Sequence, residues 1–263
     1  MTALFAPDGD EFVPSDLTRG AWNDDHQHGS PPSGLLARAI ESVPTSVPMQ
    51  VVRFVVDLFR PVPLTALRTT TTVVRDGRRI QAVDSALFAG EIQVGRASAL
   101  KIRTADLELA PHTGTPNAMP AGPEMLEPLV WDPNDDHGRT KRFHLHGVEI
   151  RSFDASFASH GPGRSWFRLN QGLVEGEELT PFARLATTAD LSNGNAQRLD
   201  TDLWTYINAD ITVYAHRMPS GEWIGMTSHA DQHASGIGVV STVVHDTDGP
   251  IGTISQAQVI DGR

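Results

Sequence analysis

Three polar residues in the second half of the chain, Asp190, Asn208 and Gln256, have side chains that could do chemistry together. A carboxylate accepts protons and hydrogen bonds, and a side-chain amide both donates and accepts, so the three could form one polar site. Each residue also has an ordinary interpretation. Asp190, just before Ser192-Asn193-Gly194, could form an Asx-turn at a helix end, and the two amides could be solvated on an outward strand face. The residues alone leave both interpretations open.

Two histidines lie close together near the N-terminus, where His26 and His28 follow Asp24 and Asp25. The spacing resembles half of a metal site, but the sequence fixes no third ligand, so no metal is expected. The more ordinary interpretation is that these histidines lie in a loop, where each is hydrogen-bonded as a cap or exposed to solvent. We expect no cofactor elsewhere in the chain either.

A second histidine pair, His144 and His146, has the same spacing ahead of a predicted strand. If that strand starts early, both histidines share one face, and this face is expected to be exposed because Phe143 and Leu145 would take the other.

The sequence excludes one class of catalytic nucleophile and disfavours another. The chain has no cysteine, and it contains no Gly-x-Ser-x-Gly elbow of the kind that serine hydrolases use.

The composition limits the partners. With 263 residues and 39% hydrophobic content, the chain can bury a sizeable core, and its net charge of -11 argues against nucleic-acid binding. The acidic N-terminus lacks a signal-peptide pattern and no apolar run is long enough for a bilayer, so we expect a cytoplasmic protein without membrane association. The cationic cluster Arg75, Arg78 and Arg79 could attract a polyanion, but a solvated hairpin at Asp76-Gly77 is the simpler interpretation.

The elements that must position these residues occur twice. Residues 50–103 align without gaps on residues 207–260 at an offset of 157, and identities such as Val83 with Val240 and Arg60 with Arg217 recur along the alignment. Period-two apolar alternation keeps step near both ends, which is typical of strands with one buried face. We therefore predict a tandem repeat of one structural module.

Each copy is predicted to contain a helix followed by four antiparallel strands, with further strands near 148–153 and 165–169 opening the second copy. Pro31-Pro32-Ser33 opens the first helix, which continues over 34–43, and Thr180-Pro181 opens the second. The main strands are predicted near 50–58, 67–75, 79–89 and 93–103 in the first copy, and near 207–215, 222–229, 236–245 and 252–260 in the second. A long helix wrapped by an antiparallel sheet is the hotdog module, so the predicted fold is α+β, a double hotdog.

The proposed domain boundaries are 1–105 for the first module, 106–145 for an irregular connection and 146–263 for the second module.

The two copies differ at two positions that are apolar in the first copy and polar in the second. Asn208 and Gln256 in the second copy replace Val51 and Ala99 in the first, and strand parity puts both amides opposite the alternating apolar residues. A polar site is therefore predicted in the second copy only.

The chain resembles the acyl-CoA thioesterase II (TesB-like) family of double hotdogs over nearly its whole length. The resemblance is carried by four stretches in the same order and spacing: the run Trp22 to Ala37, the pair Arg60-Pro61, the run Ile207 to Arg217, and Ser255-Gln256-Ala257. None of them is diagnostic alone. Together they imply hydrolysis of fatty acyl-CoA to free acid and CoA.

The resemblance implies a water held and activated by an Asp, a Thr or Ser, and a Gln. Asp190 falls on the first position and Gln256 on the third, whereas Asn208 departs from the family by standing where the hydroxyl residue lies. Asp190 would be the general base and the two amides would position the water. The resemblance puts His28 beside the substrate entrance, and a backbone N–H near Gly29 is expected to stabilise the oxyanion.

Two other functions stay open. If Asn208 disables turnover, the chain would be a non-catalytic acyl-CoA binding protein. A hotdog enoyl-CoA hydratase would need an Asp and a His a few residues apart, for which Asp24 or Asp25 with His28 is the one candidate. The family resemblance also suggests association into a homodimer or homotetramer.

Overall fold

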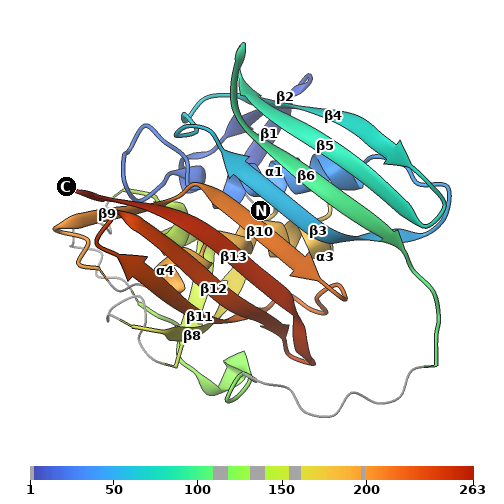
Figure 1. The fold of residues 1–263 in the computed structure, drawn as a ribbon. Coiled ribbons are helices and arrows are strands. Elements are labelled where there is room, and N and C mark those ends of the chain that lie inside the picture. Colours follow the sequence, from blue (N-terminus) through green and yellow to red (C-terminus); the bar gives the residue numbers. More distant parts are fainter. Residues whose placement is uncertain (1–2, 109–117, 131–139, 154–160, 197–198) are drawn as a thin grey trace.

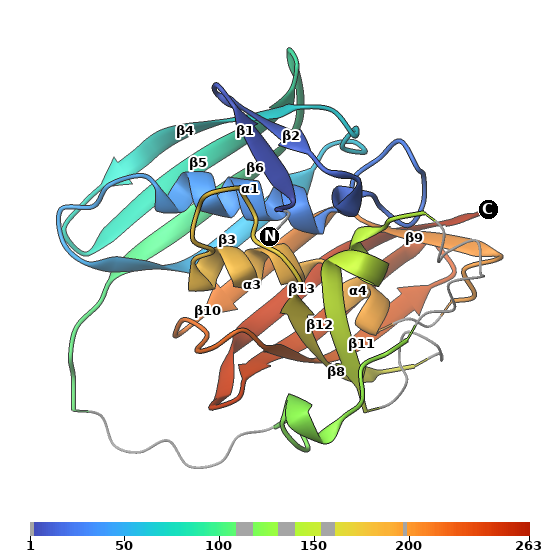
Figure 2. The same cartoon turned by 180° about the vertical axis from the view of Figure 1, so that it is seen from behind.

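The computed structural model describes residues 3–108, 118–130, 140–153, 161–196 and 199–263. Its strands form one thirteen-stranded antiparallel sheet in the order β1-β2-β4-β5-β6-β3-β10-β13-β12-β11-β8-β7, with β9 paired to β13 (Figures 1 and 2). No helix in these ranges is long and apolar enough to cross a membrane. The strands are β1 (Phe5–Asp8), β2 (Glu11–Pro14), β3 (Met49–Leu58), β4 (Leu67–Asp76), β5 (Ile80–Ala89), β6 (Ile92–Arg103), β7 (Val148–Ser152), β8 (Gly163–Leu169), β9 (Trp204–Asn208), β10 (Asp210–Ala215), β11 (Ile224–His233), β12 (Ile237–Asp246) and β13 (Gly249–Gly262).

The predicted repeat is confirmed in the register of the strands. Val83 on β5 pairs with Ala99 on β6, and the residues 157 positions later, Val240 on β12 and Gln256 on β13, pair in the same way. A register slip of one residue would exchange the two faces of a strand. This agreement therefore means that equivalent strand residues of the two copies face the same side of the sheet.

The two halves of the sheet join through β3 and β10. Val55 pairs with Thr212 across this seam, and the two residues are each other's counterparts in the repeat, since 212 − 55 = 157. The halves are therefore related by a pseudo-twofold axis through this pair. Phe54 and Phe182 pack edge to face nearby, with ring centroids 5.5 Å apart, and a single hydrophobic core contains residues of both copies.

Two helices lie side by side on the inner face of the sheet, α1 (Ser30–Glu41) from the first copy and α3 (Pro181–Ala189) from the second (Figure 2). The N-cap predicted for the second helix is confirmed, because Thr180 Oγ1 accepts a hydrogen bond from the Ala183 N–H at 3.1 Å. The first helix begins earlier than its predicted main body, at Ser30. The shorter helices are η1 (Asp16–Thr18), η2 (Pro123–Met125), η3 (Phe143–Gly147) and α4 (Ser192–Asn195).

Several local predictions were incomplete or wrong. The hairpin β1–β2 was not predicted, and it pairs with β4 to cover one edge of the sheet. The segment Phe143–Gly147 forms a π-helical turn rather than the early start of a strand. Phe143 and Leu145 are buried as predicted, but His144 is half-buried and lines a cavity instead of lying on an exposed face.

The strand predicted over 207–215 is broken at Ala209, which separates β9 from β10. The break changes the parity of the side chains, so that Asn208 and Ile211 are both buried while Ala209 is exposed. The first copy has its counterpart, a register shift at Val52 between Val51 and Arg53. The prediction that Asn208 lies opposite the buried apolar face was therefore wrong, because period-two counting does not detect a bulge.

Candidate functional site

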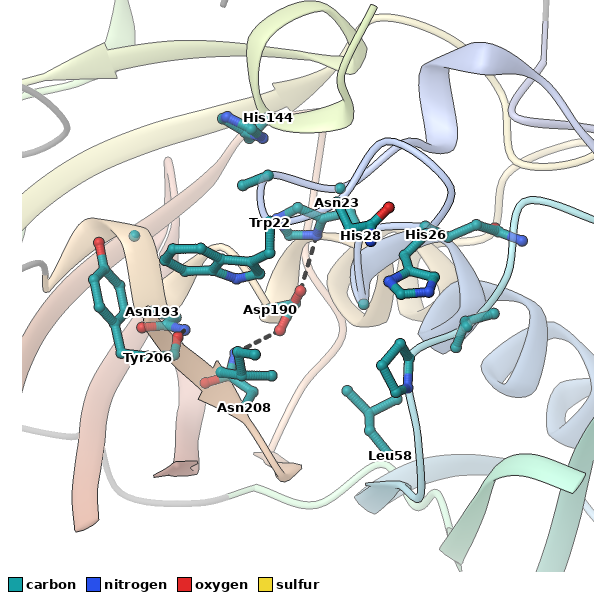
Figure 3. Close-up of a pocket in the computed structure, with 18 of the residues that line it drawn as sticks. Trp22, Asn23, His26, His28, Leu58, His144, Asp190, Asn193, Tyr206 and Asn208 are labelled. Carbon is teal, nitrogen blue, oxygen red and sulfur yellow. Dashed lines mark hydrogen bonds and ion pairs between the residues drawn. The ribbon is translucent and has the colours of Figure 1, made fainter. Parts of the chain in front are cut away.

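A cavity of about 620 Å³ opens where the C-terminal end of α3, the loop before α1 and the strand β9 meet (Figure 3). Asp190 lies in its wall, one residue after α3 ends. Trp22 and Tyr206 lie on one side of Asp190 and Leu58 lies on the other. The loop comes from the first copy and Asp190 from the second, so the cavity is formed by both.

Asp190 is held by groups from both copies. Its Oδ2 lies 2.8 Å from His28 Nδ1, and its Oδ1 accepts a hydrogen bond from Asn208 Nδ2 at 2.5 Å, as the dashed lines in Figure 3 show. The Gly29 backbone N–H also donates to this carboxylate. A carboxylate has about four acceptor positions, so three donors leave one for a further O–H group.

The surroundings keep Asp190 ionised. Burial alone would raise its pKa, because charge is disfavoured away from water. The charge and hydrogen bond of His28, the Asn208 amide and the Gly29 N–H oppose this, and together they lower the pKa of Asp190 below its usual value. The site therefore holds a negative charge that is only 7% exposed to solvent.

His28 Nδ1 lies near two groups, one of which is a hydrogen-bond acceptor and the other a donor. It lies 2.8 Å from the Asp190 carboxylate and 3.2 Å from the Ser30 N–H. An imidazole nitrogen cannot donate to one and accept from the other at the same time. We assign the proton to Nδ1 because the carboxylate contact is shorter and involves an ionised acceptor. His28 therefore orients Asp190 from the opposite side to Asn208.

Asn208 reaches Asp190 because of the strand break, which turns its side chain inward. Its Nδ2 is used by Asp190, but its Oδ1 is buried and has no hydrogen-bond partner among the described residues. A buried acceptor without a partner is unusual in a folded protein and commonly marks a position for water or a ligand. Asn208 thus offers an acceptor next to the remaining acceptor position of Asp190.

Gln256 lies apart from this pair. It is buried opposite Val240, it makes no hydrogen bond to Asp190 or Asn208, and it does not line the cavity. Both polar atoms of its amide are buried without a partner in the described part of the chain. The prediction that Gln256 lies on an outward-facing side was wrong, since Ile254, Gln256 and Gln258 face inward while Ala257 and Val259 are exposed.

Gly29 is packed directly against the carboxylate. A Cβ atom added to Gly29 would lie 2.8 Å from Asp190 Oδ2, which is closer than real Cβ contacts allow. Its N–H is used by Asp190 in this structure. The oxyanion role expected for a backbone N–H near Gly29 stays a prediction.

The loop that carries His28 is fixed by Arg142. Arg142 donates to the Gly20 carbonyl at 2.6 Å and pairs with Asp24 at 2.7 Å. Asp24 is therefore engaged by Arg142, and His28 pairs with Asp190 rather than with Asp24. Among the described residues there is no cluster of three or more potential metal ligands.

Other cavity residues were missed by the sequence reasoning. Trp22 and Tyr206 pack edge to face with ring centroids 5.1 Å apart, and His144 lies 5.9 Å from the His28 ring. Asn193 donates to the Tyr206 carbonyl and accepts from Gln258 at 2.6 Å. Gln258 itself does not line the cavity, and the comparison of copies would not have found it, because its counterpart at offset 157 is Lys101, which is also polar.

Comparison with known families agrees with the two-copy architecture. Residues 18–102 match the model of the acyl-CoA thioesterase N-terminal domain, and residues 123–260 match that of the acyl-CoA thioesterase C-terminal domain. The chain belongs to the acyl-CoA thioesterase family. No curated protein sequence matches this family member.

Solved structures show the fold. A protein of unknown function with a hotdog fold from Alicyclobacillus acidocaldarius is 15% identical, with a TM-score of 0.74 over 98% of this chain and 96% of that one. A candidate thioesterase from Novosphingobium aromaticivorans is 20% identical, with a TM-score of 0.74 over 100% of both chains. The acyl-CoA thioesterase II TesB2 from Mycobacterium marinum is 14% identical, with a TM-score of 0.66 over 94% and 96%. The predicted α+β double-hotdog fold is confirmed.

Proposed function

We propose that the protein hydrolyses acyl-CoA thioesters to a free acid and CoA, with Asp190 activating the attacking water. The single observation that carries this proposal is the buried Asp190 carboxylate, held in the cavity wall by His28, Gly29 and Asn208 with one acceptor position left. Membership of the acyl-CoA thioesterase family supports the class of substrate.

In the proposed reaction, one water O–H donates to Asp190 and the other to the unpaired Oδ1 of Asn208. The water oxygen attacks the thioester carbonyl carbon while Asp190 takes the first proton. The C–S bond then breaks, and the proton passes from Asp190 to the departing thiolate. The products are a carboxylic acid and the thiol of CoA, so atoms and charge balance without a covalent intermediate.

Asn208 replaces a hydroxyl residue of the family pattern, but it retains an acceptor directed at the water. Its role in this mechanism is positioning rather than proton transfer. Gln256 belongs to the proposed site only if substrate binding brings its unpaired amide toward the water, because it does not line the cavity in this structure.

The test is release of free thiol from a panel of short, medium and long acyl-CoAs. The chain contains no cysteine, so a thiol-reactive dye reports only CoA. Asp190→Asn should lower kcat by at least about 100-fold, the usual contribution of a general base, while the folded state is retained. Asp231→Asn is the matched control, since the Asp231 side chain is 82% exposed on β11. Undiminished hydrolysis by Asp190→Asn would show that the site is misplaced.

The binding-protein alternative retains one supporting observation, the Asn208 side chain at the hydroxyl position. Binding of acyl-CoA by the folded wild-type protein without thiol release would favour it. For the hydratase alternative, the discriminating assay is hydration of crotonyl-CoA. The pairing of His28 with Asp190, and of Asp24 with Arg142, argues against the pair of Asp24 or Asp25 with His28 that this reaction would require.

We further propose that the chain forms homodimers or homotetramers. An exposed apolar row on the outer face of the second half of the sheet supports this, since Ile207, Val259 and Ile237 lie opposite one another on β9, β13 and β12. Light scattering after size exclusion would measure the mass directly, and a monomer at micromolar concentration would contradict the proposal.

A further inference from the structure

The same arginine occurs at the end of the first main strand of both copies, and the two arginines have opposite surroundings. Arg60 and Arg217 are counterparts at the offset of 157. Arg217 makes a two-pronged ion pair with Asp246, whose side chain is fully buried, and it also donates to the Gly249 carbonyl at 3.0 Å. The cation of the second copy is therefore neutralised inside the protein.

The first copy lacks the carboxylate that would do the same for Arg60. The counterpart of Asp246 is Ala89, since 246 − 89 = 157, and the strand register confirms the match: Asp246 pairs with Gly249 as Ala89 pairs with Ile92. Arg60 is exposed, and among the described residues no carboxylate lies within ion-pair distance of it and no hydrogen bond holds its guanidinium. The first copy retains the cation and leaves it free.

Arg60 lies in the wall of the cavity that contains Asp190. Its sequence neighbours Leu58, Pro61 and Val62 also line the cavity, and Leu58 lies on the side of Asp190 away from Trp22 and Tyr206 (Figure 3). The chain has a net charge of -11 and repels anions overall, whereas an unpaired arginine at a cavity wall attracts them locally. A planar guanidinium suits the oxygens of a phosphate group.

We propose that Arg60 binds a phosphate group of the CoA half of the substrate. The inference rests on the proposed function for the identity of the anion. It assigns a direction to the substrate: the CoA half passes Leu58 and Arg60, the thioester lies at Asp190, and the acyl group extends toward Trp22 and Tyr206. Arg60 is a binding residue and takes no part in the chemical step.

Binding of free CoA tests the proposal without requiring turnover. Arg60→Gln should weaken CoA binding by roughly tenfold in titration calorimetry, the effect of losing one charge-assisted contact at an exposed position. Arg78→Gln is the matched control, because it removes the same charge from an exposed hairpin outside the cavity and should leave binding unchanged. Equal CoA affinity in wild type and Arg60→Gln, equal losses in both variants, or no CoA binding by wild type would each overturn the proposal.

Kinetics with two thioesters separates phosphate binding from a structural role. For acyl-CoA, Arg60→Gln should raise KM by a similar factor at unchanged kcat. For the same acyl group on N-acetylcysteamine, which has no phosphate, wild type and variant should give the same kcat/KM. A loss with both substrates would mean that Arg60 supports the cavity or the acyl group and would overturn the proposal. Absence of any hydrolysis would refute the proposed function alone, because the calorimetric result stands independently.

Discussion

The carboxylate of Asp190 is poised by its contacts with the other copy, and His28 makes the strongest of them. The counter-charge of His28 helps to keep the pKa of Asp190 below its ordinary value of 3.8. A general base works in its ionised form, so a lower pKa extends activity to lower pH. The acid limb of kcat/KM in the wild-type protein should therefore lie below pH 3.8.

Replacing His28 by Gln should move that acid limb to higher pH. The substitution removes the positive partner while burial, which favours the neutral acid, remains. The pH profile of kcat/KM measures the shift, and His26→Gln is the control because His26 lines the same cavity without contacting Asp190 in the described structure. An acid limb at the same pH in His28→Gln and wild type would refute this role of the ion pair.

Gly29 is predicted to be intolerant of even the smallest side chain. Because a Cβ there would lie 2.8 Å from Asp190 Oδ2, Gly29→Ala should displace the carboxylate and lower kcat by about tenfold or more. Gly172→Ala is the control, since a Cβ at Gly172 meets nothing within 4 Å. Thiol release with circular dichroism would check the loss of rate in a folded protein; full activity in Gly29→Ala would contradict the packing described.

At the scale of elements, α3 matters because Asp190 follows directly from its last turn. Its N-cap is the Thr180 hydroxyl, which accepts from the Ala183 N–H and also donates to Glu41 at 2.5 Å. Thr180→Ala should lower the free energy of unfolding by about 1 kcal/mol, and Thr180→Ser should retain most of it because the hydroxyl remains. Urea unfolding measures both, and equal destabilisation by the two substitutions would argue against the cap.

The sequence predicted most of these elements because their signals are local. Alternating residues predicted the strands, the Thr180-Pro181 pair predicted the start of α3, and the alignment at an offset of 157 predicted the tandem repeat. The break at Ala209 has no such signal, and it alone decides that Asn208 faces inward. Contacts such as His28 with Asp190 depend on how the copies dock, which local patterns do not encode.

At the scale of the whole molecule, the two copies share one core and are expected to unfold together. Phe54 from the first copy and Phe182 from the second are both fully or almost fully buried and pack edge to face. Phe54→Ala should reduce the free energy of unfolding by about 3–5 kcal/mol, the usual cost of removing a buried aromatic ring. Calorimetry should still show a single transition at a lower Tm. Two separate transitions, in wild type or variant, would show that the copies are independent.

The position of the site between the copies also has a consequence for synthesis. His28 leaves the ribosome 162 residues before Asp190, since 190 − 28 = 162. At about 5–20 residues per second, this is a delay of roughly 10–30 s. During that time the nascent first copy has no partner for the β3 edge that later pairs with β10. A nascent chain that pauses within the second copy before β10 is made exposes this open strand edge for longer. A chain released before residue 190 also lacks Asp190, so it would be prone to aggregate and would have no partial activity.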